Sequence, residues 1–124
     1  MQTYKSIEEL KSAADAQGGL IVASLLELRE AMGYGRLGER VLVQIAKELE
    51  NHGLGYYPAH ILDENATPRQ HEMVRIYIKN SKMGEIVASV LSPTDHGDEL
   101  LRERALDENA KMISDIRDIL GVTV

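Results

Sequence analysis

Aliphatic residues recur every fourth position from Leu37 to Leu49, and this repeat predicts an amphipathic helix. The predicted helix runs from about Leu37 to Asn51, and Gly53 stands where a left-handed residue commonly closes a helix. Its opposite face is polar and largely basic. One side of this helix must therefore pack against a core, while the other side faces solvent or a partner.

A second helix is expected just before the first. In Leu20–Met32, apolar residues stand four, seven and eleven positions after Ile21, which is the spacing of one helical face. The segment is apolar over much of its surface, so we expect it to be central. Gly33 and Gly35 then predict a tight turn between the two helices.

Two extended segments follow the helices. Tyr56 and Tyr57 form a short predicted strand that Pro58 ends, and Ala59–Gln70 has the composition of a polar loop. Met73–Lys79 is rich in β-branched and aromatic residues, which favours a second strand. The predicted order is therefore helix, turn, helix and hairpin.

The two ends of the chain are predicted to be helical. A capping box at Ser6 begins a first helix, and Met83–Leu91 fits a short helix better than a third strand. A long last helix is expected from about Asp98 to Leu120. We therefore expect a first domain over residues 1–94 and a C-terminal helix within residues 95–124 that packs or dimerises.

Composition limits the function classes. The chain of 124 residues contains no cysteine, which excludes disulfides and thiolate chemistry. Its polar beginning has no apolar segment typical of a signal peptide, and no apolar run is long enough to span a bilayer. We therefore expect a cytoplasmic protein without membrane contact.

Residues Leu20–Lys79, about half of the chain, resemble bacterial winged helix-turn-helix domains. The most specific part is Ile45–Leu54, where a recognition-helix ending is followed by Gly-Leu and a wing strand. The resemblance is to the superfamily and not to one family within it. It implies an α+β, mostly α fold with a winged helix-turn-helix core, a two-stranded wing and a long C-terminal helix. It also implies a DNA-binding protein, such as a transcriptional regulator.

The residues of the second helix suit such a role. A helix fits the major groove, where side chains of its N-terminal half reach base edges. Arg36 and Arg40 are expected one turn apart at that end and can pair with guanine, and Gln44 can pair with adenine. Basic residues that we expect to contact phosphates, from the helix and the segments after it, are Lys47, Arg69, Lys79 and Lys82.

Charge permits this interpretation without favouring it. The net charge is −6, which opposes nucleic-acid binding when taken as one number. Residues 95–124 contain eight acidic and four basic side chains, whereas Arg29–Lys82 contains eight basic and seven acidic ones. The acidity is thus concentrated outside the predicted DNA-binding region.

Two alternatives remain open. The basic face of the helix is also consistent with a solvated surface. The domain is also consistent with a protein-interaction module that never contacts DNA. The hypotheses differ in whether the basic side chains gather on one positive face or are neutralised by Glu39, Glu48 and Asp63. In a protein-interaction module, the partner would contact the acidic ends and three tyrosines expected to be exposed, Tyr34, Tyr56 and Tyr57.

The last helix contains a short heptad pattern. Leu106, Ile113 and Leu120 recur at intervals of seven, with Ile116 on the same side and Asn109 in the seam. The pattern fits a homodimer or packing against the core of the same chain equally well. A dimer would relate two recognition helices by a two-fold axis and predict a palindromic site.

Other motifs carry no chemistry. Gly33–Gly38 matches G-x-G-x-x-G, but a helix is expected before it instead of the strand that a dinucleotide site needs. His71 and Glu72 begin a zinc-protease motif that ends in Arg75 instead of histidine. No nucleophile is paired with a base, and no carboxylate pair stands out. We therefore expect no metal, no cofactor and no enzymatic activity.

Overall fold

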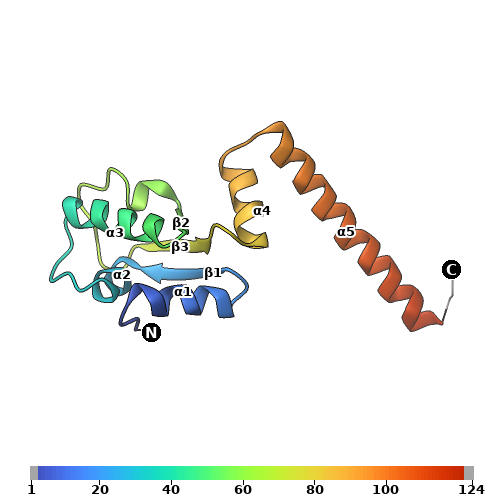
Figure 1. Ribbon diagram of the computed structural model, residues 1–124, viewed down its shortest axis with the longest axis horizontal. Helices are drawn as coiled ribbons and strands as arrows, with labels where there is room; N and C mark the ends of the chain where they lie inside the picture. Colours follow the sequence, from blue (N-terminus) through green and yellow to red (C-terminus); the bar gives the residue numbers. More distant parts are fainter. Residues whose placement is uncertain (1–2, 122–124) are drawn as a thin grey trace. The chain divides into compact units, whose positions relative to one another are not determined.

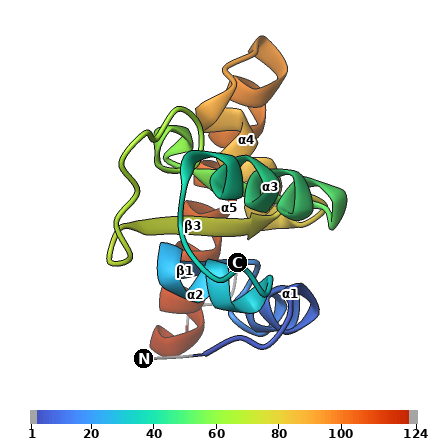
Figure 2. The same cartoon turned by 90° about the vertical axis from the view of Figure 1, so that its left-hand side faces the viewer.

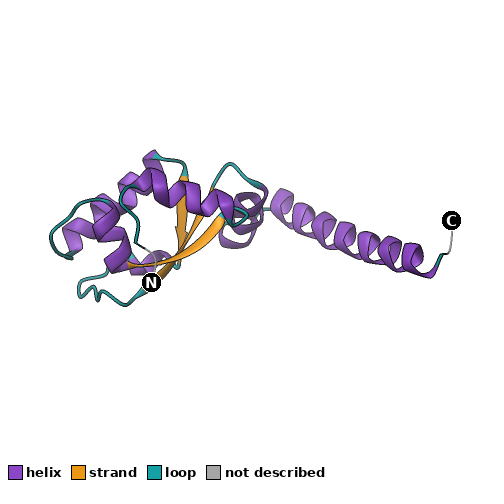
Figure 3. Ribbon diagram, turned by 90° about the horizontal axis from the view of Figure 1, so that it is seen from below, coloured by secondary structure: helices purple, strands orange, loops and turns teal. Residues whose placement is uncertain are grey.

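The computed structural model describes residues 3–121, apart from the side chains of residues 108–110. The described chain is α+β and mostly helical (Figures 1 and 3). Its elements in chain order are α1 (Ile7–Ala16), β1 (Leu20–Ser24), α2 (Leu25–Ala31), α3 (Glu39–Asn51), β2 (Leu54–Tyr57), the 3-10 helix η1 (Ala59–Ile61), β3 (Met73–Ile78), α4 (Lys82–Leu91) and α5 (Asp95–Leu120).

The chain divides into two compact units, residues 1–85 and residues 86–124. The first unit contains α1, α2, α3 and the three strands, and α4 begins in it. The second unit contains the larger part of α4 and all of α5. The candidate interface on α3 therefore belongs to the first unit, and the heptad pattern belongs to the second.

The three strands form an antiparallel sheet with the order β1-β3-β2. Side chains alternate along β3, because Val74 and Ile76 are fully buried whereas Met73 and Arg75 are exposed. In Figures 1 and 2, α3 lies on the β2 side of β3, and α1 and α2 lie on the β1 side. Buried residues of these three helices and of the strands form one core against one face of the sheet, and the other face is partly exposed.

The predicted helix over Leu20–Met32 is wrong in its first five residues, which form β1. Ser24 ends this strand and caps α2: its Oγ accepts a hydrogen bond from the Glu27 N–H at 3.1 Å, and its own N–H donates to the Glu27 carboxylate at 2.9 Å. An apolar run of this length fits a buried strand as well as a buried helix, and the capping box decides between them. The predicted two-stranded hairpin is consequently part of a three-stranded sheet.

The core is aliphatic and is built mainly by one stripe from each helix. Burying one leucine, isoleucine or valine side chain contributes about 1.5–3 kcal/mol to folding. Each helix of the first unit is therefore held by its apolar stripe. The largest fully buried side chains are Leu10 of α1, Leu25 and Leu28 of α2, Leu42, Ile45 and Leu49 of α3, and Leu54, Leu62, Val74 and Ile76 of the sheet and its loop.

The other helix predictions are confirmed within a few residues. Ser6 caps α1 by accepting a hydrogen bond from the Glu9 N–H at 3.2 Å. The amphipathic helix α3 ends at Asn51 as predicted, and Gly53 follows with a left-handed φ of 72°. Met83–Leu91 lies within α4, so the helix was the correct choice over a strand.

The last helix, α5, begins earlier than expected. Thr94 caps it through a 2.9 Å hydrogen bond from the Gly97 N–H to the Thr94 Oγ1, so the helix starts at Asp95 instead of Asp98. It ends at Leu120, where Gly121 adopts a left-handed φ of 71°. The predicted heptad region is therefore helical throughout.

The partly exposed face of the sheet contains one close contact. Gly55 of β2 pairs with Tyr77 of β3, and the Tyr77 ring covers Gly55 so closely that an added Cβ would lie 2.6 Å from the ring Cε2. The ring of Tyr57 packs beside it, with the two ring centroids 6.0 Å apart. Glycine at position 55 is what allows Tyr77 to lie flat on this face, where it is 9% exposed.

Candidate nucleic-acid interface

The side of α3 that faces away from the core is polar around one apolar residue. α3 buries Leu42, Ile45 and Leu49 on one side. At 3.6 residues per turn, the residues on the opposite side of the helix form one solvent-facing surface. We call this surface the α3 face, and its exposed members are Arg40, Val43, Gln44, Lys47 and Asn51. The structure therefore places three of the predicted DNA-binding residues, Arg40, Gln44 and Lys47, on one surface.

Val43 is a member of the α3 face that the sequence analysis did not identify. Its side chain is 45% exposed, between polar neighbours on both sides. The signal in the sequence is an aliphatic residue one position away from the buried stripe. An exposed methyl pair at this place suits contact with another apolar group, such as the methyl group of thymine.

The carboxylates of α3 lie away from the middle of this face. Glu39 and Glu50 stand at one edge of the face, and Glu50 pairs with Lys79 at 3.4 Å. Glu48 is half-buried on another side, with its carboxylate 4.0 Å from the His52 Nδ1. The two cations of the α3 face make no ion pair with any residue that the structure describes.

Arg36 does not belong to the helix. It is exposed in the turn between α2 and α3, two residues before the N-cap Gly38. The expectation that Arg36 and Arg40 lie one helical turn apart is therefore wrong. The reason is the turn itself, because Gly38 has an extended backbone and α3 begins only at Glu39.

Arg29 shapes this turn, and the sequence analysis missed it. Its Nη1 donates to the Gly35 carbonyl at 3.4 Å, and its Nη2 lies 3.9 Å from the Glu30 carboxylate. Its Nε is buried without a hydrogen-bond partner among the described residues. The available signal was the single cation among the apolar and acidic residues of α2. Arg29 ties the end of α2 to the segment that leads into α3.

The other predicted phosphate contacts are scattered. Lys79 forms the ion pair with Glu50 and thereby joins the end of β3 to the end of α3. Lys82 is exposed in the first turn of α4. Arg69 is exposed in the loop between β2 and β3. Of the seven predicted contacts, only those on α3 share an element.

The loop between β2 and β3 is folded onto the first unit. Leu62 is 1% exposed and inserts into the core. The Leu26 N–H donates to the Gln70 carbonyl at 3.2 Å, and the Leu25 N–H donates to the Glu72 carbonyl at 3.0 Å. The loop that carries Arg69 is thus held against the beginning of α2.

Glu72 organises this loop through its side chain. Its carboxylate accepts hydrogen bonds from the Arg69 N–H at 2.8 Å and from the Asn65 side-chain amide at 3.3 Å. The Arg69 N–H, more than any other group, lowers the pKa of Glu72, and the Asn65 amide acts in the same direction. Ionised Glu72 is therefore the form that holds the loop in place.

Acid should loosen this loop. Because the pKa of Glu72 is lower in the folded chain, its contribution is complete above the ordinary value of 4.5 and is lost as the pH falls through the lowered value. We expect the NMR signal of the Arg69 amide proton to titrate with a midpoint below 4.5. In Glu72→Gln, which keeps an acceptor but cannot ionise, this titration should disappear. An unchanged titration in the variant would assign the effect to another group.

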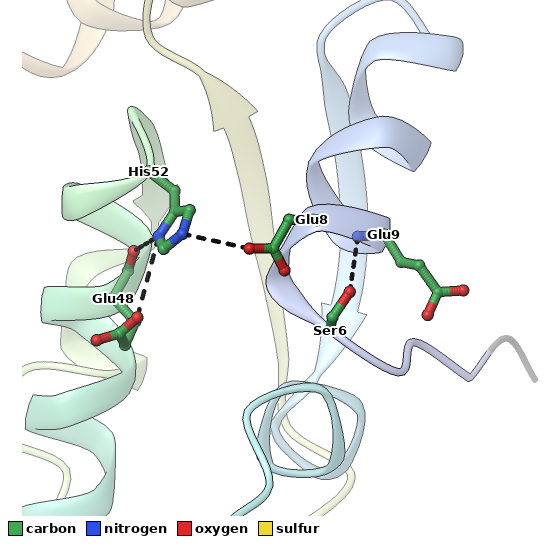
Figure 4. A network of polar contacts seen from close by, with 5 residues as sticks. All are labelled: Ser6, Glu8, Glu9, Glu48 and His52. Atoms are coloured by element: carbon green, nitrogen blue, oxygen red, sulfur yellow. Dashed lines mark hydrogen bonds and ion pairs between the residues drawn. The ribbon is translucent and has the colours of Figure 1, made fainter.

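The end of α3 is connected to the beginning of α1. His52 is the C-cap residue of α3, with its Nδ1 2.8 Å from the Glu48 carbonyl oxygen and its Nε2 3.8 Å from the Glu8 carboxylate (Figure 4). Figure 4 also shows the Ser6 cap at the neighbouring start of α1. These contacts fix the C-terminal end of the helix that carries the candidate interface.

The tyrosines do not form the exposed set that the protein-interaction hypothesis expects. Tyr34 and Tyr56 are half-buried against the core. The Tyr56 hydroxyl donates to Asp63 at 2.6 Å, and burial together with this carboxylate raises the pKa of Tyr56. Tyr57 is half-buried beside Tyr77. Their rings pack within the first unit.

The predicted dimerisation residues lie on α5. The side chains of Leu106, Ile113, Ile116 and Leu120 are all at least half-exposed. The side chain of Asn109 lies outside the described part of the structure. The described residues contain no group of three or more acidic or histidine side chains that could hold a metal ion. No helix among them is long and apolar enough to cross a membrane.

Comparison with protein-family models gives no match to this chain, and comparisons with curated proteins and with solved structures likewise give none.

Proposed function

We propose that this chain is a winged helix-turn-helix DNA-binding protein that places α3 in the major groove. The observation that supports this most is the α3 face, where two cations that form no ion pair with the described residues flank a polar and an apolar side chain on one helix. Arg40 and Gln44 are in the N-terminal half of α3 and suit base edges, while Lys47 suits a phosphate.

The order of elements also supports the proposal. Two helices joined by a turn, α2 and α3, are followed by β2, a loop and β3, as the resemblance to winged helix-turn-helix domains implies. The loop is held by hydrogen bonds to the beginning of α2, so Arg69 has a defined place. A prearranged loop loses less conformational freedom when it binds a backbone phosphate.

The proposal predicts salt-dependent binding of duplex DNA. We expect fluorescence anisotropy of a labelled random duplex to report binding at about 50 mM salt that weakens steeply by about 200 mM salt. The double variant Arg40→Ala/Lys47→Ala should lose most of this binding. Because it removes two cations, the slope of the logarithm of affinity against the logarithm of salt should become shallower by about 2.

A matched control variant distinguishes the position of the removed cations from the change in net charge. Lys11→Ala/Arg75→Ala removes two exposed cations from α1 and from the outer face of the sheet, and it should bind DNA like the wild type. Equal losses in both double variants would show that only net charge matters. Absence of binding at low salt would argue against the DNA-binding proposal.

One observation favours the alternative of a protein-interaction module. The sheet face opposite the core exposes Val22 to 43% and Met73 to 42%, and the exposed Arg75 lies between Val22 and Tyr57. Exposed apolar side chains around one cation suit a protein partner better than a phosphate backbone. Under this alternative, substitutions of Val22 or Met73 would impair partner binding, whereas Arg40→Ala/Lys47→Ala would not.

A further inference from the structure

The two ends of α3 are held in place by different contacts. Its C-terminal end is joined to α1 through His52 and to the end of β3 through the ion pair of Glu50 with Lys79. At its N-terminal end, the N-cap residue Gly38 has no side chain that could cap the helix. The half of α3 that carries Arg40 therefore starts from a boundary that the helix itself does not stabilise.

Backbone hydrogen bonds at the end of α2 reach only as far as Tyr34. The Tyr34 N–H donates to the Arg29 carbonyl at 3.1 Å, which is the kind of bond that closes many helices at a glycine. Among the described residues, one hydrogen bond reaches residues 35–37, from the Arg29 Nη1 to the Gly35 carbonyl at 3.4 Å. The segment that leads into α3 is therefore held by Arg29 and by the partly buried side chain of Leu37.

The surroundings of Arg29 do not explain this residue by stability alone. Its side chain is 19% exposed, and its nearest carboxylate, on the exposed Glu30, is 3.9 Å away. Its Nε is buried and has no acceptor among the described residues. A buried donor without a partner lowers stability, and an apolar side chain of similar shape would avoid this loss. What the guanidinium does provide is the bond to the Gly35 carbonyl.

We propose that Arg29 is a positioning residue for DNA binding, which fixes residues 35–37 through the Gly35 carbonyl and thereby sets where α3 begins. This inference rests on the proposed function of the α3 face. Arg29 acts through Arg40 and Gln44, because the first two turns of α3 determine where these side chains point. A binding surface that is ordered in advance loses less conformational freedom when its partner binds.

Amide hydrogen exchange tests the positioning without DNA. Arg29→Met keeps an apolar stem but removes the donors. The Leu42 N–H, which donates to the Gly38 carbonyl at 3.0 Å, should then exchange about 2–10-fold faster, the factor that corresponds to one net hydrogen bond. The His52 N–H, at the other end of α3, should exchange as in the wild type. The urea midpoint should stay the same or rise, because the unpartnered Nε is removed as well.

Binding of the labelled duplex tests the consequence for DNA. Arg29→Met should bind about 2–10-fold more weakly at each salt concentration, with an unchanged salt slope because no phosphate contact is lost. Arg29→Lys keeps a cation and a donor and should recover part of the affinity. A slope shallower by about 1 would mean that Arg29 contacts a phosphate itself, which overturns the positioning role. A fall in the urea midpoint that parallels the loss of binding would overturn it too, because the role would then be purely structural.

Arg36→Met is the matched control for the exchange measurement. It removes a cation from the same turn, where the Arg36 side chain is exposed and bonds to none of the described residues. It should leave the exchange of the Leu42 N–H unchanged, and equal acceleration in both variants would overturn the role of the bond to Gly35. If the wild-type chain binds no DNA, the proposed function fails while the exchange result stands. If the wild type binds and Arg29→Met binds equally well, the inference alone fails.

Discussion

Ile45→Ala should lower the free energy of unfolding by about 2–5 kcal/mol. Ile45 is fully buried in the middle of α3, where it joins the helix to the core of the first unit. Truncation removes three carbon atoms and leaves a cavity that a packed core fills only in part. Because a small domain is stable by about 5–15 kcal/mol, this one change would remove a large share of its stability. Urea unfolding followed by circular dichroism measures the loss.

Val43→Ala is the matched control for Ile45→Ala. Val43 is also β-branched and lies on the same helix, but it belongs to the exposed α3 face. Its truncation should change the free energy of unfolding by no more than about 0.5 kcal/mol. Similar losses in the two variants would mean that α3 does not pack by the face described above.

Gly84→Ala should destabilise the chain although it lies in a helix. Helix propensity alone predicts that alanine is better than glycine by about 1 kcal/mol. An added Cβ, however, would collide with the carbonyl oxygens of Ile78 and Lys79 and lie 2.7 Å from the Lys79 carbonyl carbon. Backbone atoms cannot turn aside as a side chain can, so we expect a net loss of about 1–3 kcal/mol.

Gly35→Ala is the control for the glycine prediction. Nothing lies within 4 Å of a Cβ added at Gly35, and its backbone is outside the left-handed region. The free energy of unfolding of Gly35→Ala should stay within about 0.5 kcal/mol of the wild-type value. If Gly84→Ala proved as stable as Gly35→Ala in urea unfolding, the close approach of α4 to the end of β3 would be wrong.

The sequence predicts most helices of this chain because their apolar spacing and their caps agree. The strict spacing of α3 and the glycine after it left one interpretation. Leu20–Ser24 allowed two interpretations, because an uninterrupted apolar run fits a buried strand and a buried helix equally. The pairing of this segment with β3 is a long-range contact, which the spacing of apolar residues does not reveal. The insertion of Leu62 into the core is missed for the same reason, since it depends on how the loop closes.

The candidate interface was predictable only where one helix carries it. Arg40, Gln44 and Lys47 follow from the period of α3. Arg36 was misplaced, because the beginning of α3 depends on the conformation of a glycine-rich turn that Arg29 ties to α2. The pairing of Lys79 with Glu50 joins residues far apart in the sequence, and no local pattern announces it.

The contact between Gly55 and Tyr77 restricts how this chain can change during evolution. Any side chain at position 55 would enter the space that the Tyr77 ring fills. A larger residue at 55 therefore requires the Tyr77 ring to turn aside or to be replaced, and either change would disturb its packing beside Tyr57. Substitutions at positions 55 and 77 are therefore expected to occur together.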